Sequence, residues 1–320
     1  MTNGEKLFLV LADELNFSRA AKKSFLSQQC LSDHIQRLEE HYGTQLFVRK
    51  PAVALTPAGE ALQRTLYAIQ NMEAGLEAEL SELEKGSRGT LRIGMNYARA
   101  RLLAPALFEQ YYPRYPHVKI ELMLEETTTM QKLLERGKLD FFLGVNTNLQ
   151  PPEKAIPLAK ERIYLVASMA FLRQNLHMVS EDLVNLEREI DLRIFQDMPF
   201  VVNHAKSTTF LLIDQYTSIH NIKLNQVLSV SDYDVMARIC RLGHTVFFCP
   251  QFILPSVLQE NEHHGEEQAL YAFSIKDFPY TLRFDLICNE TVHYPKFALD
   301  CIQQIKDIVQ ASLERMAGNR

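Results

Sequence analysis

Apolar residues recur at helical spacing through the first part of the chain. They stand every three or four positions in two groups, Leu7, Leu11 and Leu15, and then Leu31, Ile35 and Leu38. This spacing gathers the apolar side chains of each group on one face of a helix. It predicts a first helix over 5–14 and another that begins after Ser27.

A short helix is predicted between those two. Ser18 suits its N-cap, and the small side chains of Ala20 and Ala21 would let a second helix cross it closely. After a connector at 24–26, Ser27 can cap the next helix. Two short helices at a steep angle are typical of the helix-turn-helix motif, whose second helix lies in the DNA major groove. Helix pairs of this kind also occur in other helical domains, so the spacing alone leaves DNA binding open.

The polar face of the second motif helix holds the candidate base-reading residues. They are Ser27, Gln28, Gln29, Ser32, Asp33, Gln36 and Arg37. The carboxylate of Asp33 would repel phosphate, but it can accept a hydrogen bond from cytosine N4. Arg19, in the first motif helix, is a candidate phosphate contact, although a solvated basic residue is the simpler interpretation for any one cation of this region.

Two short strands are predicted directly after the helix pair. Gly43 suits a helix C-cap, and residues 46–50 and 53–55 alternate in polarity on either side of a turn. Such a hairpin would form a wing beside the motif. Arg49 and Lys50 stand at its tip, where cations suit contacts to DNA phosphates.

From Thr56 a long helix is predicted to about Lys85. Its apolar residues alternate at steps of four and three and are Leu62, Leu66, Ile69, Leu76, Leu80 and Leu83. A seam of this kind favours a coiled coil between two chains. Burial of the helix against its own domain is the alternative. Residues 86–89 then have the composition of a flexible joint.

Strands and helices alternate beyond the joint. The first unit has predicted strands at 90–94, 118–124 and 140–145, with helices at 102–112 and 128–136. A crossover strand at 163–167 leads to a second unit, with strands at 199–202, 227–230 and 245–249 and helices at 208–220 and 233–242. A return strand at 280–288 and a last helix at 295–316 follow. The βαβαβ order of the first unit predicts a parallel sheet covered on both faces, and the two units together predict two α/β lobes.

Composition sets the outer bounds of the interpretation. The chain has 320 residues, of which 47% are hydrophobic and 23% are charged, as in a globular protein of two or three domains. Its formal net charge of -5 does not indicate nucleic-acid binding, so any such site must be a local basic patch. No export signal and no apolar run of membrane-spanning length is present. We therefore expect a cytoplasmic protein without a membrane partner.

Motifs for catalysis, cofactors and metals are missing. The five cysteines are scattered without a CxxC pair, which indicates buried reduced thiols rather than a zinc site or a disulfide framework. A redox switch involving Cys240 and Cys249 is the alternative. The chain contains no GxSxG, P-loop, GxGxxG after a strand, or HExxH. We expect no enzyme activity, no cofactor and no metal; the pair His263 and His264 is better explained by a charged loop.

The N-terminal residues resemble a known family. The segments that carry the likeness are Phe17-Ser18-x-Ala20-Ala21, Leu26-Ser27-Gln28, Ser32, Ile35, Leu38-Glu39, Gly43, Leu46-Phe47-x-Arg49 and Leu55-Thr56-x-Ala58-Gly59. In order and spacing they resemble the signature of LysR-type transcriptional regulators. Ser24, Gln29 and Asp33 depart from the usual pattern, which leaves the base preference open. Weaker cues in the second half are Ile93-Gly94, Leu103-x-Pro105, Gly137-x-Leu139-Asp140 and Leu242-Gly243.

The resemblance implies a fold and a domain plan. A winged helix-turn-helix domain, mainly α, would span 1–57, and a dimerisation helix with a hinge would span 58–88. A two-lobed α/β effector domain like a periplasmic binding protein would span 89–320. Its first lobe would comprise 89–162 and 275–320, and its second lobe 163–274.

The resemblance also implies a function and partners. It indicates a bacterial regulator that binds double-stranded operator DNA as homodimers, which pair into tetramers, and that responds to a small-molecule effector. Two alternatives stay open: a regulator switched by thiol oxidation or pH, and a protein like a solute-binding receptor without specific DNA binding.

The effector would lie beyond the carboxyl ends of the strands, between the lobes. The candidate residues in these positions are Arg99, Arg101, Thr127, Thr128, Asn146, Asn203, Ser207, Thr208 and Asp232. The two arginines stand at a helix N-terminus, which favours an anion, so a small anionic organic effector is the hypothesis. Each residue alone could be an ordinary polar loop residue. His244, in a tight turn, is a candidate for ligand contact or pH sensing, or a hydrogen-bonded turn histidine.

Overall fold

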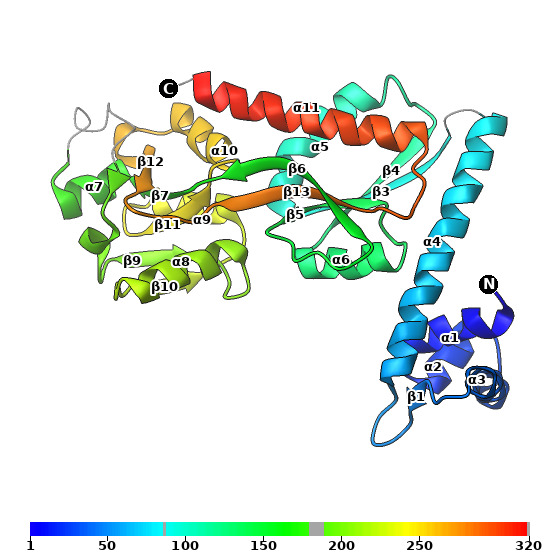
Figure 1. Cartoon of the computed structure of the whole chain (residues 1–320). Coiled ribbons are helices and arrows are strands. Elements are labelled where there is room, and N and C mark those ends of the chain that lie inside the picture. The colour runs from blue at the N-terminus through cyan, green and yellow to red at the C-terminus, as the bar shows by residue number, and fades with distance from the viewer. Residues whose placement is uncertain (86–87, 179–188, 319–320) are drawn as a thin grey trace.

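The computed structural model describes residues 1–85, 88–178 and 189–318. A helical N-terminal domain is joined through one long helix, α4, to two α/β lobes that lie side by side (Figure 1). Gly86 and Ser87 of the predicted joint lie outside the described residues. Across the described ranges, no helix is both long and apolar enough to cross a bilayer.

Three helices with side-chain caps build the N-terminal domain. They are α1 (Asn3–Glu14), α2 (Phe17–Lys23) and α3 (Gln28–Tyr42). Asn16, rather than Ser18, caps α2 by accepting a hydrogen bond from the backbone N–H of Arg19. The prediction of Ser18 as N-cap is wrong because the helix begins two residues earlier, at Phe17, and the Ser18 hydroxyl instead donates to Gln28 Oε1 at 2.8 Å. Ser27 caps α3, as predicted.

The predicted apolar face of α3 forms the centre of this domain. Leu31 and Ile35 are fully buried and Leu38 nearly so, against residues of α1 and of the wing. The wing is a short antiparallel pair, β1 (Phe47–Val48) and β2 (Ala54–Leu55). This core therefore fixes which side of α3 faces solvent.

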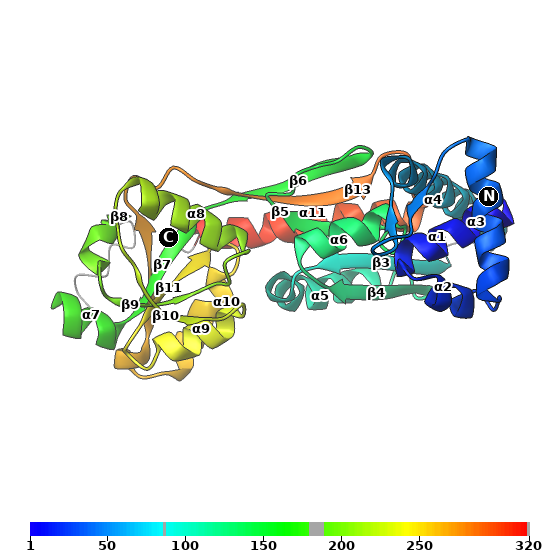
Figure 2. The same ribbon diagram turned by 90° about the horizontal axis from the view of Figure 1, so that it is seen from below.

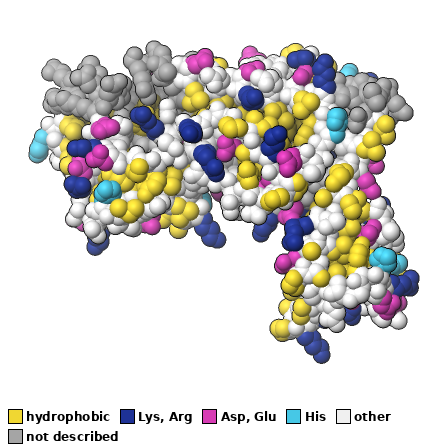
Figure 3. All heavy atoms as spheres, viewed as in Figure 1, with side chains coloured by type: hydrophobic (Ala, Val, Ile, Leu, Met, Phe, Trp, Pro, Cys, Tyr) yellow, Lys and Arg dark blue, Asp and Glu magenta, His cyan; other side chains and the backbone are white. Residues whose placement is uncertain are grey.

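The long helix α4 (Pro57–Lys85) divides its apolar seam between two environments. Leu66 is 1% exposed and packs in the core of the N-terminal domain, with Leu62 at its edge. Ile69 and Leu80 are exposed, and Leu76 is 55% exposed. Hydrophobic side chains accordingly gather along this helix in Figure 3. The side chain of Leu83 lies outside the described residues.

The first lobe is built on a five-stranded sheet in the order β4-β3-β5-β13-β6. Its strands are β3 (Gly89–Met95), β4 (Val118–Leu124), β5 (Phe141–Val145), β6 (Glu153–Glu161) and β13 (Leu282–Asn289). The first three are parallel, but β13 runs antiparallel to both β5 and β6. The parallel arrangement predicted for the first three strands is confirmed. The predicted return strand is β13, and it makes the whole sheet mixed because it comes back from the second lobe in the opposite direction.

The second lobe has a six-stranded mixed sheet in the order β10-β9-β11-β7-β12-β8. Its strands are β7 (Ile163–Ser168), β8 (Glu189–Ile190), β9 (Pro199–Val202), β10 (Asn225–Ser229), β11 (Val246–Pro250) and β12 (Leu270–Ile275). Here β9, β10 and β11 are parallel, and β7 is antiparallel to β11 and β12. The β6–β7 and β12–β13 connections are the two crossings between the lobes.

Helices cover both sheets. The first lobe has α5 (Tyr97–Tyr111), α6 (Thr127–Glu135) and α11 (Lys296–Gly318), and the second has α7 (Met169–Leu176), α8 (Thr208–Ile219), α9 (Tyr233–Cys240) and α10 (Leu254–Gln259). Short 3-10 turns occur at Leu192–Phe195, Glu260–His263 and Glu266–Gln268. In Figure 2, α5 and α10 lie on one side of the junction between the lobes, and α6 and α8 lie on the other.

The division of the α4 seam leads to a stability prediction. We expect Leu66→Ala to lower the free energy of unfolding of the N-terminal domain by about 2–5 kcal/mol, because it leaves a cavity in a packed core. Gln70→Ala, an exposed position on the same helix, should change it by less than about 0.5 kcal/mol. Amide hydrogen exchange of α1–α3 measures both. Equal exchange in the two variants would contradict the packing of Leu66.

Candidate DNA-binding face and interlobe cleft

The predicted base-reading residues share the solvent-exposed side of α3. Gln28, Gln29, Asp33, Gln36 and Arg37 are exposed, and Ser32 is half-buried. They lie there because Leu31, Ile35 and Leu38, on the opposite side of the helix, are buried in the core of the domain. The structure therefore presents these polar groups together, as a helix entering a major groove requires.

Glu39 is a residue of this site that the sequence reasoning missed. Its Oε1 accepts hydrogen bonds from the backbone N–H groups of Leu46 at 2.8 Å and of Phe47 at 3.2 Å. Its Oε2 lies 3.6 Å from the guanidinium of Arg49, which also stacks over the Phe17 ring at 5.4 Å. Glu39 thus ties the wing to α3. The signal was its position next to a buried leucine in the family signature.

The basic patch is partly neutralised by a neighbouring carboxylate. Lys23 Nζ lies 2.8 Å and Arg19 Nε lies 3.4 Å from the carboxylate of Glu14. The hydrogen bond from Lys23 holds the pKa of Glu14 below its usual value. Both cations remain well exposed, so they can exchange this carboxylate for a DNA phosphate. Lys50 is exposed at the wing tip.

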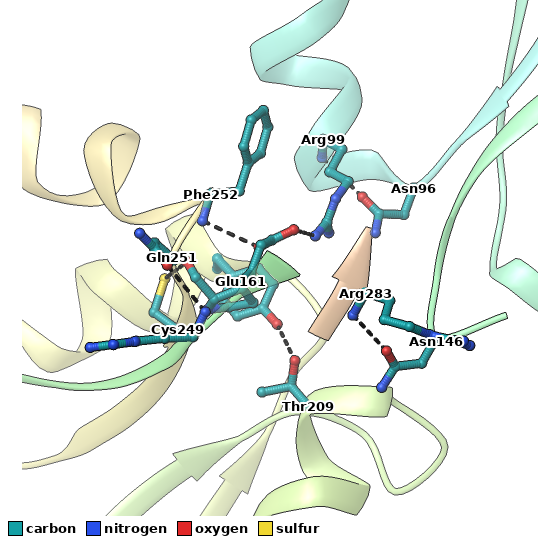
Figure 4. A network of polar contacts seen from close by, with 12 residues as sticks. Asn96, Arg99, Asn146, Glu161, Thr209, Cys249, Gln251, Phe252 and Arg283 are labelled. Atoms are coloured by element: carbon teal, nitrogen blue, oxygen red, sulfur yellow. Dashed lines mark hydrogen bonds and ion pairs between the residues drawn. The ribbon is translucent and has the colours of Figure 1, made fainter. Parts of the chain in front are cut away.

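The lobes meet around a buried ion pair, Arg99–Glu161. Arg99 stands in the first turn of α5, which Asn96 caps, and Glu161 ends β6 (Figure 4). The Arg99 side chain is 3% exposed and the Glu161 side chain is 0% exposed. Glu161 also accepts a hydrogen bond from Phe252 N at 3.2 Å, and the guanidinium stacks over Phe284 at 4.2 Å.

The sequence predicts that Arg99 binds an anionic effector, but in the structure this side chain is not free to do so. Its guanidinium is already bonded to a carboxylate of the same chain and is closed off from solvent. The reason is the strand β6, which the sequence did not reveal and which brings Glu161 to the N-terminus of α5.

Arg101, two residues after Arg99 in α5, forms an ion pair with Asp234 of α9, on the other side of the junction between the lobes. The pair lies at a pocket of about 470 Å³ between α5, α9 and α10. Side chains that line this pocket include Tyr97, Arg101, Asp232, Tyr233, Asp234 and Glu260. The structure thus brings together two candidates, Arg101 and Asp232, and adds two further carboxylates.

The other candidates lie on the α6 and α8 side of the junction. Glu126, just before Thr127 and Thr128, lies 3.6 Å from Nε2 of His204, which follows Asn203 in the second lobe. Some of these candidates have structural partners of their own. Ser207 caps α8 by accepting from Phe210 N, Thr208 begins that helix, and Asn146 Oδ1 accepts from Arg283 N at 2.7 Å.

His244 does not join the cleft. It is exposed in the turn between α9 and β11. Tyr233, at the first residue of α9, lines the pocket, and the helix of 8 residues then runs about 12 Å away from it. The turn needs Gly243 for its backbone φ of 85°.

Comparison with known proteins assigns both halves of the chain. Residues 5–60 match the family described as bacterial regulatory helix-turn-helix protein, lysR family, and residues 84–264 match the LysR substrate binding domain. The HTH-type transcriptional regulator YkuM of Bacillus subtilis is 25% identical over 305 residues, which cover 95% of this chain and 96% of that protein.

Solved structures agree with the fold from end to end. ArgP from Mycobacterium tuberculosis has a TM-score of 0.68, with 18% identity over 97% of this chain and 96% of the other. A variant of full-length OxyR from Pseudomonas aeruginosa has a TM-score of 0.64, with 19% identity over 97% of this chain and 95% of the other. Identities this low indicate the fold alone. The two family matches, together with the winged helix-turn-helix and the paired α/β lobes, show that the chain belongs to the LysR family of DNA-binding transcriptional regulators.

Proposed function

We propose that the chain binds operator DNA as a homo-oligomer and responds to a small organic effector held between its lobes. The observation that carries the proposal is the pocket between α5, α9 and α10, because residues from both lobes line it. A ligand there contacts both lobes at once, so it stabilises one arrangement of the lobes over another. A regulator of transcription acts where the DNA is, so we infer that the protein works in the bacterial cytoplasm.

The effector would be an anion that competes with Asp234 for Arg101. Arg99 is sealed by Glu161, whereas Arg101 is 54% exposed and borders the pocket. A bound carboxylate would replace Asp234 and release the contact between α5 and α9. Differential affinity of this kind is what lets a ligand shift a conformational equilibrium.

The domain plan of the proposal follows the predicted boundaries. The DNA-binding domain would span 1–57 and the dimerisation helix and hinge 58–88, with the effector domain at 89–320. The two sheets support a division of the effector domain, because β3–β6 and β13 form one and β7–β12 the other. The lobes would comprise 89–162 with 275–320, and 163–274.

Dimerisation through α4 is supported by its exposed apolar side chains. Ile69, Met72, Leu76 and Leu80 are all exposed over successive turns of the helix. An apolar stripe of this length on a single chain is typical of a surface that a second chain covers. Pairing of two such dimers would give the tetramer implied by the family resemblance.

A thiol switch, the alternative to a ligand, is not favoured by the cysteines of the effector domain. Burial raises the pKa of Cys240 and of Cys301 to about 12, and it raises the pKa of Cys249 and Cys288 as well. These groups are neutral thiols near pH 7, whereas oxidation proceeds through the thiolate. Cys30, on α3, is only half-buried.

The effector site can be tested by titrating small organic acids into the protein and measuring the heat of binding. Arg101→Ala should weaken the binding of the active acid about tenfold or more, because a charge-assisted contact is lost. Arg114→Ala is the matched control, since Arg114 is 56% exposed and paired with Asp300 elsewhere. Equal affinities in wild type and Arg101→Ala would remove Arg101 from the site.

The dimerisation proposal predicts the effect of charges in the α4 stripe. Leu76→Lys combined with Leu80→Lys should weaken operator binding in gel shifts at least as much as Arg49→Ala, because unpaired DNA-binding domains lose the second half-site. Light scattering should show smaller particles. Gln70→Lys, at another exposed position of α4, should retain both properties. Unchanged operator binding in the double variant would overturn the role of the stripe.

The burial of four of the five thiols predicts that operator binding is insensitive to peroxide. In a Cys30→Ser protein, operator affinity should be the same before and after treatment with hydrogen peroxide, since the other four thiols are buried and protonated. Mass spectrometry of the treated protein should find these thiols unmodified. A reversible change of several-fold in affinity would instead favour the redox alternative.

A further inference from the structure

The C-terminal end of α6 contacts the DNA-binding domain and α4. Arg136, the residue that follows α6, lies 3.3 Å from Oδ1 of Asp13 at the end of α1. The same oxygen accepts a hydrogen bond of 2.5 Å from the Tyr67 hydroxyl of α4. Burial, together with this bond, raises the pKa of Tyr67, so its hydroxyl stays a donor. One carboxylate therefore joins α1, α4 and the first lobe.

A second contact lies one turn further along α4. The amide of Asn71, which is 7% exposed, donates to the carbonyl of Glu135 at 3.1 Å. Gly137, in the loop two residues after Glu135, has a backbone φ of 64°. A Cβ at this position would lie 2.0 Å from Asn71 Oδ1. An exposed ion pair alone would contribute little. The buried amide bond and the close approach at glycine make this junction a specific one.

The N-terminal end of α6 contacts the other lobe. Glu126, its N-cap residue, lies 3.6 Å from His204, which follows β9. The helix has 9 residues and is about 13 Å long. One end of α6 thus lies at the junction of the lobes, and the other lies at the DNA-binding domain and α4. Figure 1 shows the junction and the DNA-binding domain on opposite sides of α6.

The helix α6 packs on the first-lobe sheet through a small cluster of its own. Met130 and Leu134 are buried in a small cluster with Leu139, Phe142 and Ile287. This cluster is separate from the large core shared by α5, α11 and both sheets. A packed helix held by a small cluster of its own can shift as a unit by sliding over its sheet.

We propose that α6 couples the arrangement of the two lobes to the position of the DNA-binding domain. A change in the arrangement of the lobes would reach α6 through the contact between Glu126 and His204. It would pass to the DNA-binding domain through the contacts of Arg136 with Asp13 and of Glu135 with Asn71, which we call the α6 latch. The proposal rests on the proposed function for the nature of the signal. The contacts themselves belong to a single chain and can be tested without the effector.

The first experiment measures whether the latch exists. Amide hydrogen exchange of 67–75 and of 133–138 should rise about threefold or more in Arg136→Ala and in Asn71→Ala, and further in the double variant. Arg173→Ala is the control, since Arg173 pairs with Glu266 in the second lobe, away from α6. Thermal melting verifies that each variant is folded. Unchanged exchange in the double variant would overturn the latch.

The second experiment measures the coupling. His204→Ala should change exchange in 67–75 about threefold in the protein with an intact latch, although His204 contacts the far end of α6. In the Arg136→Ala, Asn71→Ala background the same substitution should have no such effect. Equal effects in the two backgrounds, or an effect confined to residues near 204, would overturn the coupling.

Operator binding then separates the two proposals. The change in operator affinity caused by His204→Ala, measured with DNA from the chain's own upstream region, should likewise depend on the latch. If the wild type shows no specific binding to this DNA, the proposed function is refuted. The hydrogen-exchange experiments would still decide the role of α6.

Discussion

The arrangement of the two lobes depends on the buried ion pair between Arg99 and Glu161. Two charges removed from water carry a large desolvation cost, and they are tolerated only with close pairing and additional bonds. Here Phe252 N donates to Glu161, and the Phe284 ring lies under the guanidinium. These partners come from α5, from β6 and β13, which lead to the crossings between lobes, and from the segment after β11. Arg99 and Glu161 both belong to the first lobe, and the bond from Phe252 N connects them to the second lobe at one buried point.

This buried point shapes what the rest of the junction can do. Because Arg99 already pairs with a carboxylate of its own chain and is closed off from solvent, the proposed ligand would be recognised by contacts that are more exposed and exchangeable. Two such contacts cross the junction on opposite sides of it, Arg101–Asp234 and Glu126–His204. Each joins one lobe to the other with less burial than Arg99–Glu161, so a change in either can alter the lobes without disrupting their shared core.

The long helix α4 has a different neighbour on each part of its length. Leu66 belongs to the core of the DNA-binding domain, Asn71 contacts the C-terminal end of α6, and Leu76 is exposed to solvent. A single rigid helix thus carries an intradomain, an interdomain and an exposed surface. Because all three surfaces belong to one continuous helix, the coupling proposed for α6 would move the DNA-binding core and the exposed stripe together.

Local sequence determined the elements, because caps and periodicity act over a few residues: Ser27 and Gly43 bound α3, and Leu31, Ile35 and Leu38 define its buried face. Residue patterns also predicted the wing and the two α/β lobes, and the family resemblance implied how these parts are arranged in domains. The sequence by itself did not reveal β6, whose residues lack alternation, nor that the predicted return strand, β13, pairs antiparallel to β5 and β6 and so makes the sheet mixed. Only the tertiary structure decided that Arg99 meets Glu161 and that Leu66 faces its own domain, because such pairings depend on where distant segments come to lie.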